Sequence, residues 1–408
     1  MTDYSLESPF VQQLDADIVD FIHKGIDLSD EINFNKLAVA EFEYQFNVND
    51  IYREYCTRKN VTPESISSWD EIPAVPSQAF KEHIIASFPL EKTELSYMTG
   101  GTTTKKRAKI FRDKSAVELI FEANKQCTRS FLFPDVEKMK ILFMVPSPKI
   151  APTMGMAVGL EQVRRNFGTE DSEFLITPRG LNIDLLFRSL RGAEDSGEPI
   201  ALIGATSGFV YFFNACEKEG ISFELPKGSR ISDGGGYSGK FGECSRNEYH
   251  QKCEQILGIP QNHCVNTYGT GESSTNYFDN VLQNHVSSKD EPRFKISPPW
   301  TRTIAVDTKT FERLPEGEIG LLRHCDLANR AMVIKVQTDN LGYETKNGFE
   351  IIGRAGVKEG EIKTTPIDNM VGQMAEHRMG RFIDSFLHSL IKWQVPRRAK
   401  KYKKTKVM

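Results

Sequence analysis

The chain has 408 residues, of which 39% are hydrophobic and 26% are charged, so it can bury a core and is not a disordered protein. Lys and Arg number 52 against 55 Asp and Glu, and a net charge of −3 excludes general attraction to nucleic acid. No apolar run reaches the roughly 18–20 residues that span a bilayer. The acidic, polar N-terminus does not have the pattern of a signal peptide, so we expect a cytoplasmic protein.

The first part of the chain, residues 1–90, is predicted to be mainly helical. Val11, Leu14 and Ile18 recur at helical spacing, and a second aromatic-rich apolar set covers residues 42–52. Prolines within residues 73–76 then interrupt the helical pattern. We therefore expect a helical N-terminal region that belongs to a larger domain.

From residue 91 to 353, short apolar runs alternate with longer amphipathic segments. The runs predict strands and the segments predict helices, an alternation typical of an α/β fold with a mainly parallel sheet covered by helices. The predicted strands are 141–145, 200–203, 230–232 and 263–266, and the predicted helices are 115–130, 207–219 and 247–257. Within this core, β-branched residues and turns over 300–350 predict a small, antiparallel, β-rich appendage.

The last region, residues 354–408, contains one predicted helix near 375–393, because Phe382, Phe386 and Leu390 fall at helical spacing. The basic segment 397–406 is predicted to be a solvated tail. Contact with an acidic partner or a phosphate is the alternative for this segment.

A Gly/Thr-rich segment, residues 98–106, is the best local signal for chemistry. Its glycines allow backbone amides to approach an anion, and its hydroxyls and lysines add donors and charge. The residues concerned are Thr99, Gly100, Gly101, Thr102, Thr103, Thr104 and Lys105. The spacing of a Walker A loop is absent, and a plain surface turn is the alternative to a phosphate-binding loop.

Two further segments follow predicted strands, where ligands bind in parallel sheets. Gly234 and Gly235, after Asp233, would let a flat ring lie against the backbone, although a glycine-rich turn without a ligand is the alternative. Residues 266–274 hold Tyr268, Gly269, Thr270 and Glu272. The tyrosine can stack on a base, the threonine can contact phosphate, and the carboxylate can bind Mg²⁺. The alternative is a helix N-terminus with Glu272 in its first turn.

The fourth segment places Asp339 and Asn340 at the end of a predicted strand, followed by Arg354. A carboxylate or amide there can bind ribose hydroxyls, and the planar guanidinium can reach phosphate or ribose. A polar turn between strands is the alternative.

In their order and separations, these four segments resemble the adenylate-forming (ANL) superfamily. The chain looks most similar to the LuxE-type acyl-protein synthetase branch, with phenylacetate-CoA ligases next, over residues 65–355. Residues 72–81 and 317–320 add to the resemblance. It implies a large adenylate-forming domain whose core is 91–353, and a shortened C-terminal region, 354–408, with a helix and a basic tail.

The resemblance also implies a two-step reaction and a role for each residue. A carboxylate attacks the α-phosphate of ATP, and the acyl group then passes from acyl-AMP to a thiol. The implied catalytic residues are Thr102, Thr103, Lys105 and Glu272, the last also binding Mg²⁺. The implied nucleotide contacts are the phosphates at Thr99–Thr104, adenine at Gly234, Gly235 and Tyr268, the α-phosphate at Thr270 next to Gly269, ribose at Asp339 or Asn340, and phosphate or ribose at Arg354.

The sequence departs from the family pattern at three places. Thr104 stands where the last glycine of the loop is usual, and Asp339 lacks a preceding glycine. LuxE-type synthetases carry the acyl group on a cysteine shortly after the Gly-Arg pair, whereas Cys325 is the last cysteine of this sequence. The third departure argues against self-acylation at that place.

A structural zinc site is a further hypothesis, because some relatives of the phenylacetate-CoA ligases carry zinc in this part of the chain. The candidate ligands are Cys244, His250, Cys253 and Cys264. The alternative places Cys253 in a hydrophobic stripe with Tyr249 and Ile256.

We therefore predict an enzyme that uses ATP and Mg²⁺ to activate a carboxylic acid, fatty or aromatic, as acyl-AMP. The acyl group would pass to a thiol acceptor: CoA, an acyl carrier protein or a partner acyl reductase. A relative without catalytic activity, which binds nucleotide or an acyl chain as an assembly partner, is the alternative.

Overall fold

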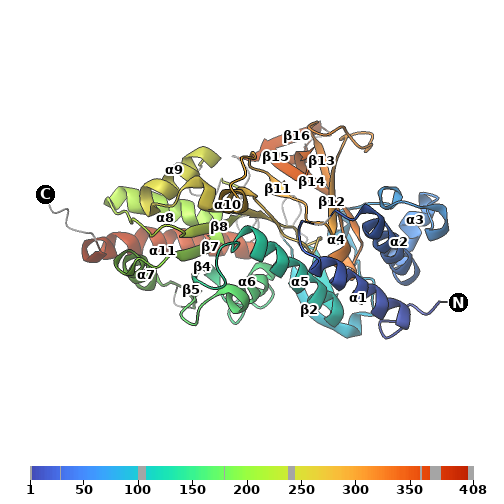
Figure 1. The fold of residues 1–408 in the computed structure, drawn as a ribbon, viewed down its shortest axis with the longest axis horizontal. Coiled ribbons are helices and arrows are strands. Elements are labelled where there is room, and N and C mark those ends of the chain that lie inside the picture. The colour runs from blue at the N-terminus through green and yellow to red at the C-terminus, as the bar shows by residue number, and fades with distance from the viewer. Residues whose placement is uncertain are drawn as a thin grey trace. The chain divides into compact units, whose positions relative to one another are not determined.

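The computed structural model describes residues 2–27, 29–99, 107–178, 180–237, 244–358, 361–367 and 378–402 (Figure 1). They group into two compact units, which we describe separately. Unit 1 comprises Met1–Ser130, Gly269–Tyr277 and Phe294–Thr364. Unit 2 comprises Phe131–Tyr268, Phe278–Arg293 and Thr365–Met408.

Unit 1 begins with helices, as predicted. Side chains at the N-caps satisfy free backbone amides of the first three helices: Ser8 accepts from Val11 N, Asp30 from Asn33 N, and Asn49 from Tyr52 N. The helices are α1 (Pro9–His23), α2 (Glu31–Val48), α3 (Asp50–Arg58), the short α4 (Ala79–Glu82) and α5 (Lys114–Phe131). The 3-10 helices of the described chain are η1 (Pro63–Ser65), η2 (Trp69–Glu71), η3 (Leu90–Lys92), η4 (Gln261–His263) and η5 (Leu327–Asn329).

The main sheet of unit 1 has the order β11-β15-β14-β13-β12 and is antiparallel, and the predicted antiparallel appendage is therefore present. β1 pairs with β14 in parallel, and β16 pairs with β15. A separate antiparallel hairpin is formed by β2 and β3. The strands are β1 (Val75–Pro76), β2 (Thr93–Met98), β3 (Lys109–Asp113), β11 (Lys295–Ile296), β12 (Thr301–Val306), β13 (Gly320–Asp326), β14 (Lys335–Thr345), β15 (Gly348–Lys358) and β16 (Glu361–Pro366).

A fully buried guanidinium joins distant segments of unit 1. Arg330 Nε donates to Asp15 Oδ1 on α1 at 2.8 Å, and its Nη atoms donate to Asp113 on β3 at 2.9 and 2.7 Å. The Arg330 side chain is 0% exposed. Because removing one partner of such a pair leaves a buried charge, its loss costs about 3–5 kcal/mol.

Unit 2 is built on a sheet of order β10-β9-β8-β7-β4-β5-β6, in which neighbouring strands from β9 to β5 are parallel. β7 is buried along its whole length, which explains its apolar sequence. The strands are β4 (Lys140–Pro146), β5 (Glu173–Thr177), β6 (Gly180–Leu181), β7 (Ile200–Ala205), β8 (Arg230–Gly234), β9 (Cys264–Tyr268) and β10 (Tyr277–Phe278). The four predicted strands are thus confirmed as β4, β7, β8 and β9.

Helices flank this sheet, and the three helices predicted within the core are confirmed as α5, α8 and α9. In Figure 1, the C-terminal helix α11 runs beside α8 and α7, and contacts between these helices agree with the view. The helices of unit 2 are α6 (Gly155–Phe167), α7 (Ile183–Ser196), α8 (Thr206–Glu219), α9 (Arg246–Leu257), α10 (Val281–Val286) and α11 (Arg378–Tyr402).

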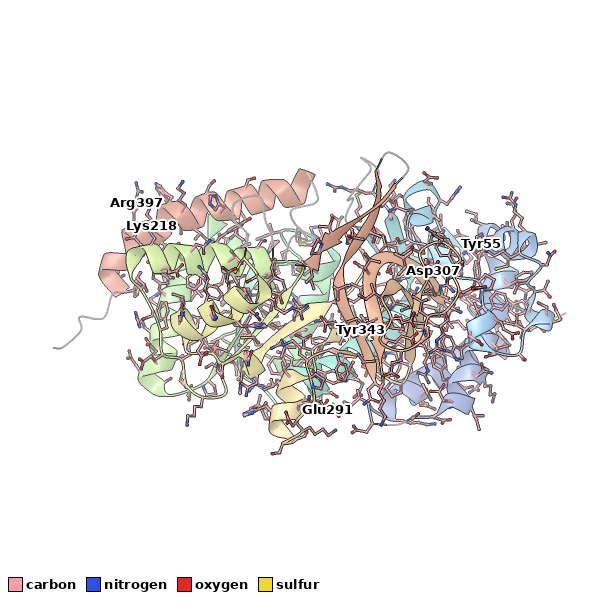
Figure 2. All side chains as sticks on the ribbon, turned by 90° about the horizontal axis from the view of Figure 1, so that it is seen from above. Tyr55, Lys218, Glu291, Asp307, Tyr343 and Arg397 are labelled. Carbon is pink, nitrogen blue, oxygen red and sulfur yellow. The ribbon has the colours of Figure 1, made fainter. Side chains whose placement is uncertain are left out.

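The predicted solvated tail is wrong for residues 397–402, because α11 continues through them. Ala399 is buried, and the ring of Tyr402 packs edge-on against Phe187 with centroids 5.4 Å apart. Figure 2 labels Arg397 on α11 and Lys218 on α8, both of which are exposed residues of unit 2. In the part of the chain that the structure describes, no helix combines the length and apolar composition needed to cross a membrane.

Candidate functional site

The turn after β9, which contains the predicted metal ligand, is organised by a buried carboxylate. Asp326 Oδ2 accepts hydrogen bonds from Ser273 Oγ at 2.9 Å, Ser274 N at 3.0 Å and Thr275 N at 2.7 Å. Its Oδ1 accepts from Thr275 Oγ1 at 2.9 Å. A single side chain at the end of β13 therefore fixes the backbone of the turn in unit 1.

Asn329 holds the same turn from a second position. Its Nδ2 donates to the carbonyl oxygen of Glu272 at 3.0 Å, and its Oδ1 accepts from Ser274 Oγ at 2.8 Å. Glu272 lies in a turn rather than in a helix, so the alternative of a helix N-terminus is wrong. The main chain of Glu272 is thus held by side chains from η5.

The side chain of Glu272 is buried, with 8% of the residue exposed. Burial raises the pKa of this carboxyl, its own backbone amide and Lys81 oppose the rise, and Asp339 adds to it. The side chain of Thr99 also forms a hydrogen bond with this carboxyl, which lowers its pKa. Two residues predicted from separate segments, Thr99 and Asp339, therefore both act on Glu272 within unit 1.

Close packing holds the β2–β3 hairpin against the turn. A Cβ atom at Gly271 would lie 2.2 Å from Cγ2 of Thr99, so only glycine fits there. Tyr97 Oη donates to the carbonyl oxygen of Gly271 at 3.4 Å. The contact between Thr99 and Glu272 thus rests on backbone approach as well as on a side-chain hydrogen bond.

Thr270 has an unused hydroxyl. Its Oγ1 atom is buried and has no hydrogen-bond partner among the described residues. Such a group is costly unless something satisfies it, and a phosphate oxygen is a strong acceptor for a hydroxyl. The residue predicted to contact the α-phosphate therefore has a donor available. At the neighbouring Gly269, a Cβ atom would lie 2.1 Å from Asn276 Oδ1.

The predicted ribose contacts lie on adjacent strands. Asn340 on β14 is opposite Arg354 on β15, and Arg354 Nε lies 3.4 Å from Asp339 Oδ1. The Asp339 side chain is partly exposed, whereas Asn340 is buried. Of the two residues that the sequence left as alternatives, Asp339 is the more accessible to a ligand.

In unit 2, the predicted adenine contacts follow the ends of β8 and β9. Gly235 has a φ of +107°, and a Cβ atom at Gly234 would lie 3.4 Å from the carbonyl oxygen of Thr267. Tyr268 is the last residue of β9 and is half-buried. These positions lie at the carboxyl edge of the parallel strands.

Polar residues that the sequence reasoning missed lie at the same edge. The buried carboxylate of Asp233 accepts from Thr206 Oγ1 at 2.7 Å and from Asn266 Nδ2 at 2.8 Å. Thr206 directly follows β7, and Asp233 and Asn266 lie in the C-terminal part of β8 and at the middle of β9, so their placement on neighbouring parallel strands was the available signal. In unit 1, Lys81 was also missed, although it closes the segment 72–81.

Comparison with known proteins identifies the family of the chain. The family model of the acyl-protein synthetase LuxE matches residues 13–363. The chain belongs to the LuxE acyl-protein synthetase family.

Relatives and solved structures agree with this family. The long-chain-fatty-acid–luciferin-component ligase of Aliivibrio fischeri is 25% identical over 76% of this chain and 78% of its own. The corresponding ligase of Vibrio harveyi is 24% identical, with the same shares covered. The structure of 2-hydroxyisobutyryl-CoA ligase in complex with 2-HIB-AMP and CoA has a TM-score of 0.57 and 12% identity, over 81% of this chain and 77% of that chain.

The last similarity shows the fold, which is that of adenylate-forming enzymes, as predicted. Membership of the LuxE family makes the chain an acyl-activating ligase. Its function at the level of the family is ATP-dependent activation of an acyl group and transfer to a thiol acceptor.

Two sets of predicted residues remain in this LuxE-family chain: the rest of the Gly/Thr-rich segment and the candidate zinc ligands. Gly100, Gly101, Thr102, Thr103, Thr104 and Lys105 lie outside the described residues. Cys244, His250, Cys253 and Cys264 are described and buried. Among the described residues, no three His, Cys, Asp or Glu side chains are grouped as a metal site, so the zinc hypothesis has no support. Cys253 instead lies in the hydrophobic core with Tyr249 and Ile256, as the alternative predicted.

Proposed function

We propose that this LuxE-family ligase uses ATP and Mg²⁺ to activate a long-chain fatty acid as acyl-AMP and passes the acyl group to a thiol on another molecule. The fatty acid is favoured over an aromatic acid because both curated relatives bear the name of a long-chain-fatty-acid ligase. The observation that carries the proposal is the contact between Thr99 and Glu272, which joins the start of the phosphate-binding segment to a buried carboxylate.

The first step forms a bond between a carboxylate oxygen of the acid and the α-phosphorus of ATP, and pyrophosphate leaves. Thr270 donates its free hydroxyl to the α-phosphate, and Thr99 orients the carboxylate of Glu272. When Mg²⁺ is bound at Glu272, it neutralises charge on the phosphate oxygens. The role of the protein is to position the reactants and to stabilise developing charge.

Ribose and adenine are held by the other predicted residues. Asp339 accepts hydrogen bonds from the ribose hydroxyls, and the guanidinium of Arg354 lies beside this carboxylate. Asn340 supports the strand beside them. Gly234, Gly235 and Tyr268 border the adenine ring.

The second step is transfer of the acyl group, and the cysteines of the chain bear on its acceptor. All seven are free and buried. Burial raises the pKa of Cys56 to about 12 and that of Cys325 to about 12, and it raises the pKa of Cys127 and Cys253 well above the usual value. Because the thiolate is the nucleophile, these thiols are poor acyl carriers.

The acceptor is therefore an external thiol, on CoA, an acyl carrier protein or a partner acyl reductase. Its sulfur attacks the carbonyl carbon of acyl-AMP, AMP leaves, and the thiol proton is released to solvent. We place the enzyme in the cytoplasm, where such thiols are reduced.

Carboxylate-dependent exchange of labelled pyrophosphate into ATP tests the first step. We expect exchange with long-chain fatty acids and a loss of about 100-fold or more in Glu272→Gln, comparable to the loss of one group that stabilises a transition state. Glu312→Gln, which changes an exposed carboxylate of unit 1, should leave exchange intact. Nucleotide binding without exchange across a broad panel of acids would instead favour the non-catalytic assembly partner.

Mass spectrometry of the protein after incubation with ATP, Mg²⁺ and fatty acid tests the second step. We expect no covalent acyl group on the chain and formation of a thioester when CoA or a carrier thiol is added. A thioester on one of the seven cysteines would contradict the external acceptor.

A further inference from the structure

The β2–β3 hairpin of unit 1 buries a guanidinium that forms no hydrogen bond with the described part of the chain. Arg112 on β3 is fully buried. None of its three guanidinium nitrogens has a hydrogen-bond partner among the residues that the structure describes. A charge taken out of water without compensation is costly, so buried charges are normally paired or bind a ligand. An anion that is not part of the described chain is the natural partner of this group.

The position of Arg112 shows which face of the hairpin it occupies. Arg112 is opposite Leu95, and Ile110 is opposite Tyr97, and residues directly opposite each other share a face of the sheet. Pairing continues beyond the strand ends, where Thr99 N donates to Ala108 O at 3.0 Å. Arg112 therefore lies on the same face as Tyr97 and Thr99, four residue pairs along the hairpin from Thr99.

That face is the one that packs on the turn of Glu272. Tyr97 contacts Gly271 through its hydroxyl, and Thr99 contacts both Gly271 and the Glu272 carboxyl. The opposite face carries Met98 and Lys109, which are exposed. Arg112 is thus buried on the side of the hairpin that faces the candidate site.

Nearby charges indicate which anion fits. The carboxylate next to Arg112 in the chain, Asp113, is already bound to Arg330 and caps α5 through Ala116 N at 3.2 Å. Helix α4, which packs against β3, carries Lys81, a second cation that acts on Glu272. Two cations on contacting elements suit an anion with several charges better than a single carboxylate.

We propose that Arg112 binds the terminal phosphates of ATP, and the pyrophosphate that the first step releases, on the Thr99 face of the hairpin. The proposal rests on the proposed function, because it adds a residue to the same nucleotide site. The planar guanidinium can donate two parallel hydrogen bonds to phosphate oxygens, and its burial makes each bond stronger than at a surface. Arg112 is in this view a substrate-binding residue that becomes paired only when phosphate is present.

Calorimetry with inorganic pyrophosphate on the full-length protein tests the proposal. Arg112→Met should weaken pyrophosphate binding by about tenfold or more, the usual effect of losing hydrogen bonds to a charged group. Arg112→Lys, which keeps the charge but not the fork, should give an intermediate loss. Lys109→Met removes a cation from the exposed face of the same strand and should leave binding unchanged.

Thermal unfolding of the ligand-free protein distinguishes a binding role of Arg112 from a structural role, because the two roles predict opposite changes in the melting temperature. Replacing an unpaired buried charge by an apolar side chain of similar length should keep or raise the melting temperature. A lower melting temperature in Arg112→Met with unchanged pyrophosphate binding would mean that Arg112 is structural, and would overturn the proposal.

Two further binding measurements, with AMP and with a fatty acid, test whether Arg112 binds the terminal phosphates or another part of the substrates. AMP lacks the terminal phosphates, so its affinity should be the same in Arg112→Met and in the unchanged protein. Weaker fatty-acid binding with normal pyrophosphate binding would assign Arg112 to the acyl carboxylate and overturn the proposal. If the unchanged protein shows no exchange at all, the proposed function itself fails. If it exchanges and Arg112→Met exchanges equally well, only this inference fails.

Discussion

The two units differ in how many charged side chains they bury: among the described residues, unit 2 buries Arg230, Asp233 and Asp279, fewer than unit 1. The core of unit 2 is largely apolar, with strands such as β7 buried along their whole length. Unit 1 also buries aliphatic and aromatic side chains, but it encloses a set of charged groups between its helices, hairpin and antiparallel sheet: Glu41, Arg112, Asp326, Arg330 and Lys335. Apolar burial stabilises the fold but does not orient the buried groups, whereas hydrogen bonds to buried charges hold the bonded groups in defined positions. The comparison indicates that unit 1 relies more than unit 2 on hydrogen bonds to buried charges to fix the positions of its groups.

The strongest test of this contrast removes the carboxylate that organises the turn in unit 1. Asp326→Ala leaves the hydrogen-bond donors of Ser273, Ser274 and Thr275 without their acceptor. We expect a loss of about 4 kcal/mol or more in the free energy of unfolding, measured by urea denaturation. Pyrophosphate exchange should fall with it, even at temperatures where the variant is folded. Asp326→Asn, which keeps one acceptor oxygen, should lose less of both, and an equal loss would contradict this role.

A matched change in unit 2 should affect stability alone. Leu202 on β7 lies between Leu142 and Ile231 on the neighbouring strands and is 1% exposed. Leu202→Ala should lower the free energy of unfolding by about 2–5 kcal/mol through lost burial and a cavity. The KM for ATP, measured on folded protein, should not change. A large rise in this KM would show that the interior of the parallel sheet, and not only the residues at its edge, affects nucleotide binding.

Acid should weaken unit 1 through a buried histidine. Burial lowers the pKa of His324 to about 3, so its imidazole stays neutral in the folded chain while the unfolded chain takes up a proton below about pH 6.5. The unfolded state then binds more protons, and stability falls as the pH falls from 6.5 toward 3. The loss from this group is about 2 kcal/mol at pH 5.

Replacing this histidine should make the acid limb of the stability curve less steep. In His324→Asn, the free energy of unfolding should change less between pH 7 and pH 5 than in the unchanged protein. His83→Asn, at an exposed position, serves as the control. An unchanged slope in His324→Asn would show that other groups govern the acid response.

The smallest expected change in stability is that of Thr270→Val, which we compare with Thr275→Val in the same turn. Thr270→Val removes a hydroxyl that no described residue bonds, so stability should stay the same, while the KM for ATP should rise about tenfold. Thr275→Val removes a hydroxyl that donates to Asp326 and accepts from Trp300 Nε1 at 3.0 Å, and should cost about 1–3 kcal/mol. If Thr270→Val also destabilises the protein, its hydroxyl is structural.

The sequence predicted unit 2 better than unit 1, for a physical reason. Strands buried on both faces appear as continuous apolar runs, so β4, β7, β8 and β9 could be located from composition alone. In unit 1, the decisive contacts join residues far apart in the chain, such as Asn329 and Glu272, and no local pattern reveals them. The domain boundaries and the site residues assigned by resemblance stay predictions.

The C-terminal helix shows where local composition misled. A cluster of basic residues after Arg397 indicates solvent exposure, and Arg397 and Arg398 are indeed exposed. The helix continues because Val395 and Ala399 lie on its buried face and Tyr402 reaches Phe187. At the candidate site, the order of the motifs was informative, but the hydrogen bonds that hold Glu272 could not be inferred from it.

The pairing of Arg330 with Asp15 makes the beginning of the chain a structural requirement for its second half. The two residues are 315 positions apart, yet their side chains meet in the interior of unit 1. A variant trimmed past the first helix would leave Arg330 paired with Asp113 alone, beside the segment that fixes the Glu272 turn. Shortened forms made for crystallisation should therefore keep this helix, and a synthetic peptide of residues 1–27 could restore a trimmed protein by complementation.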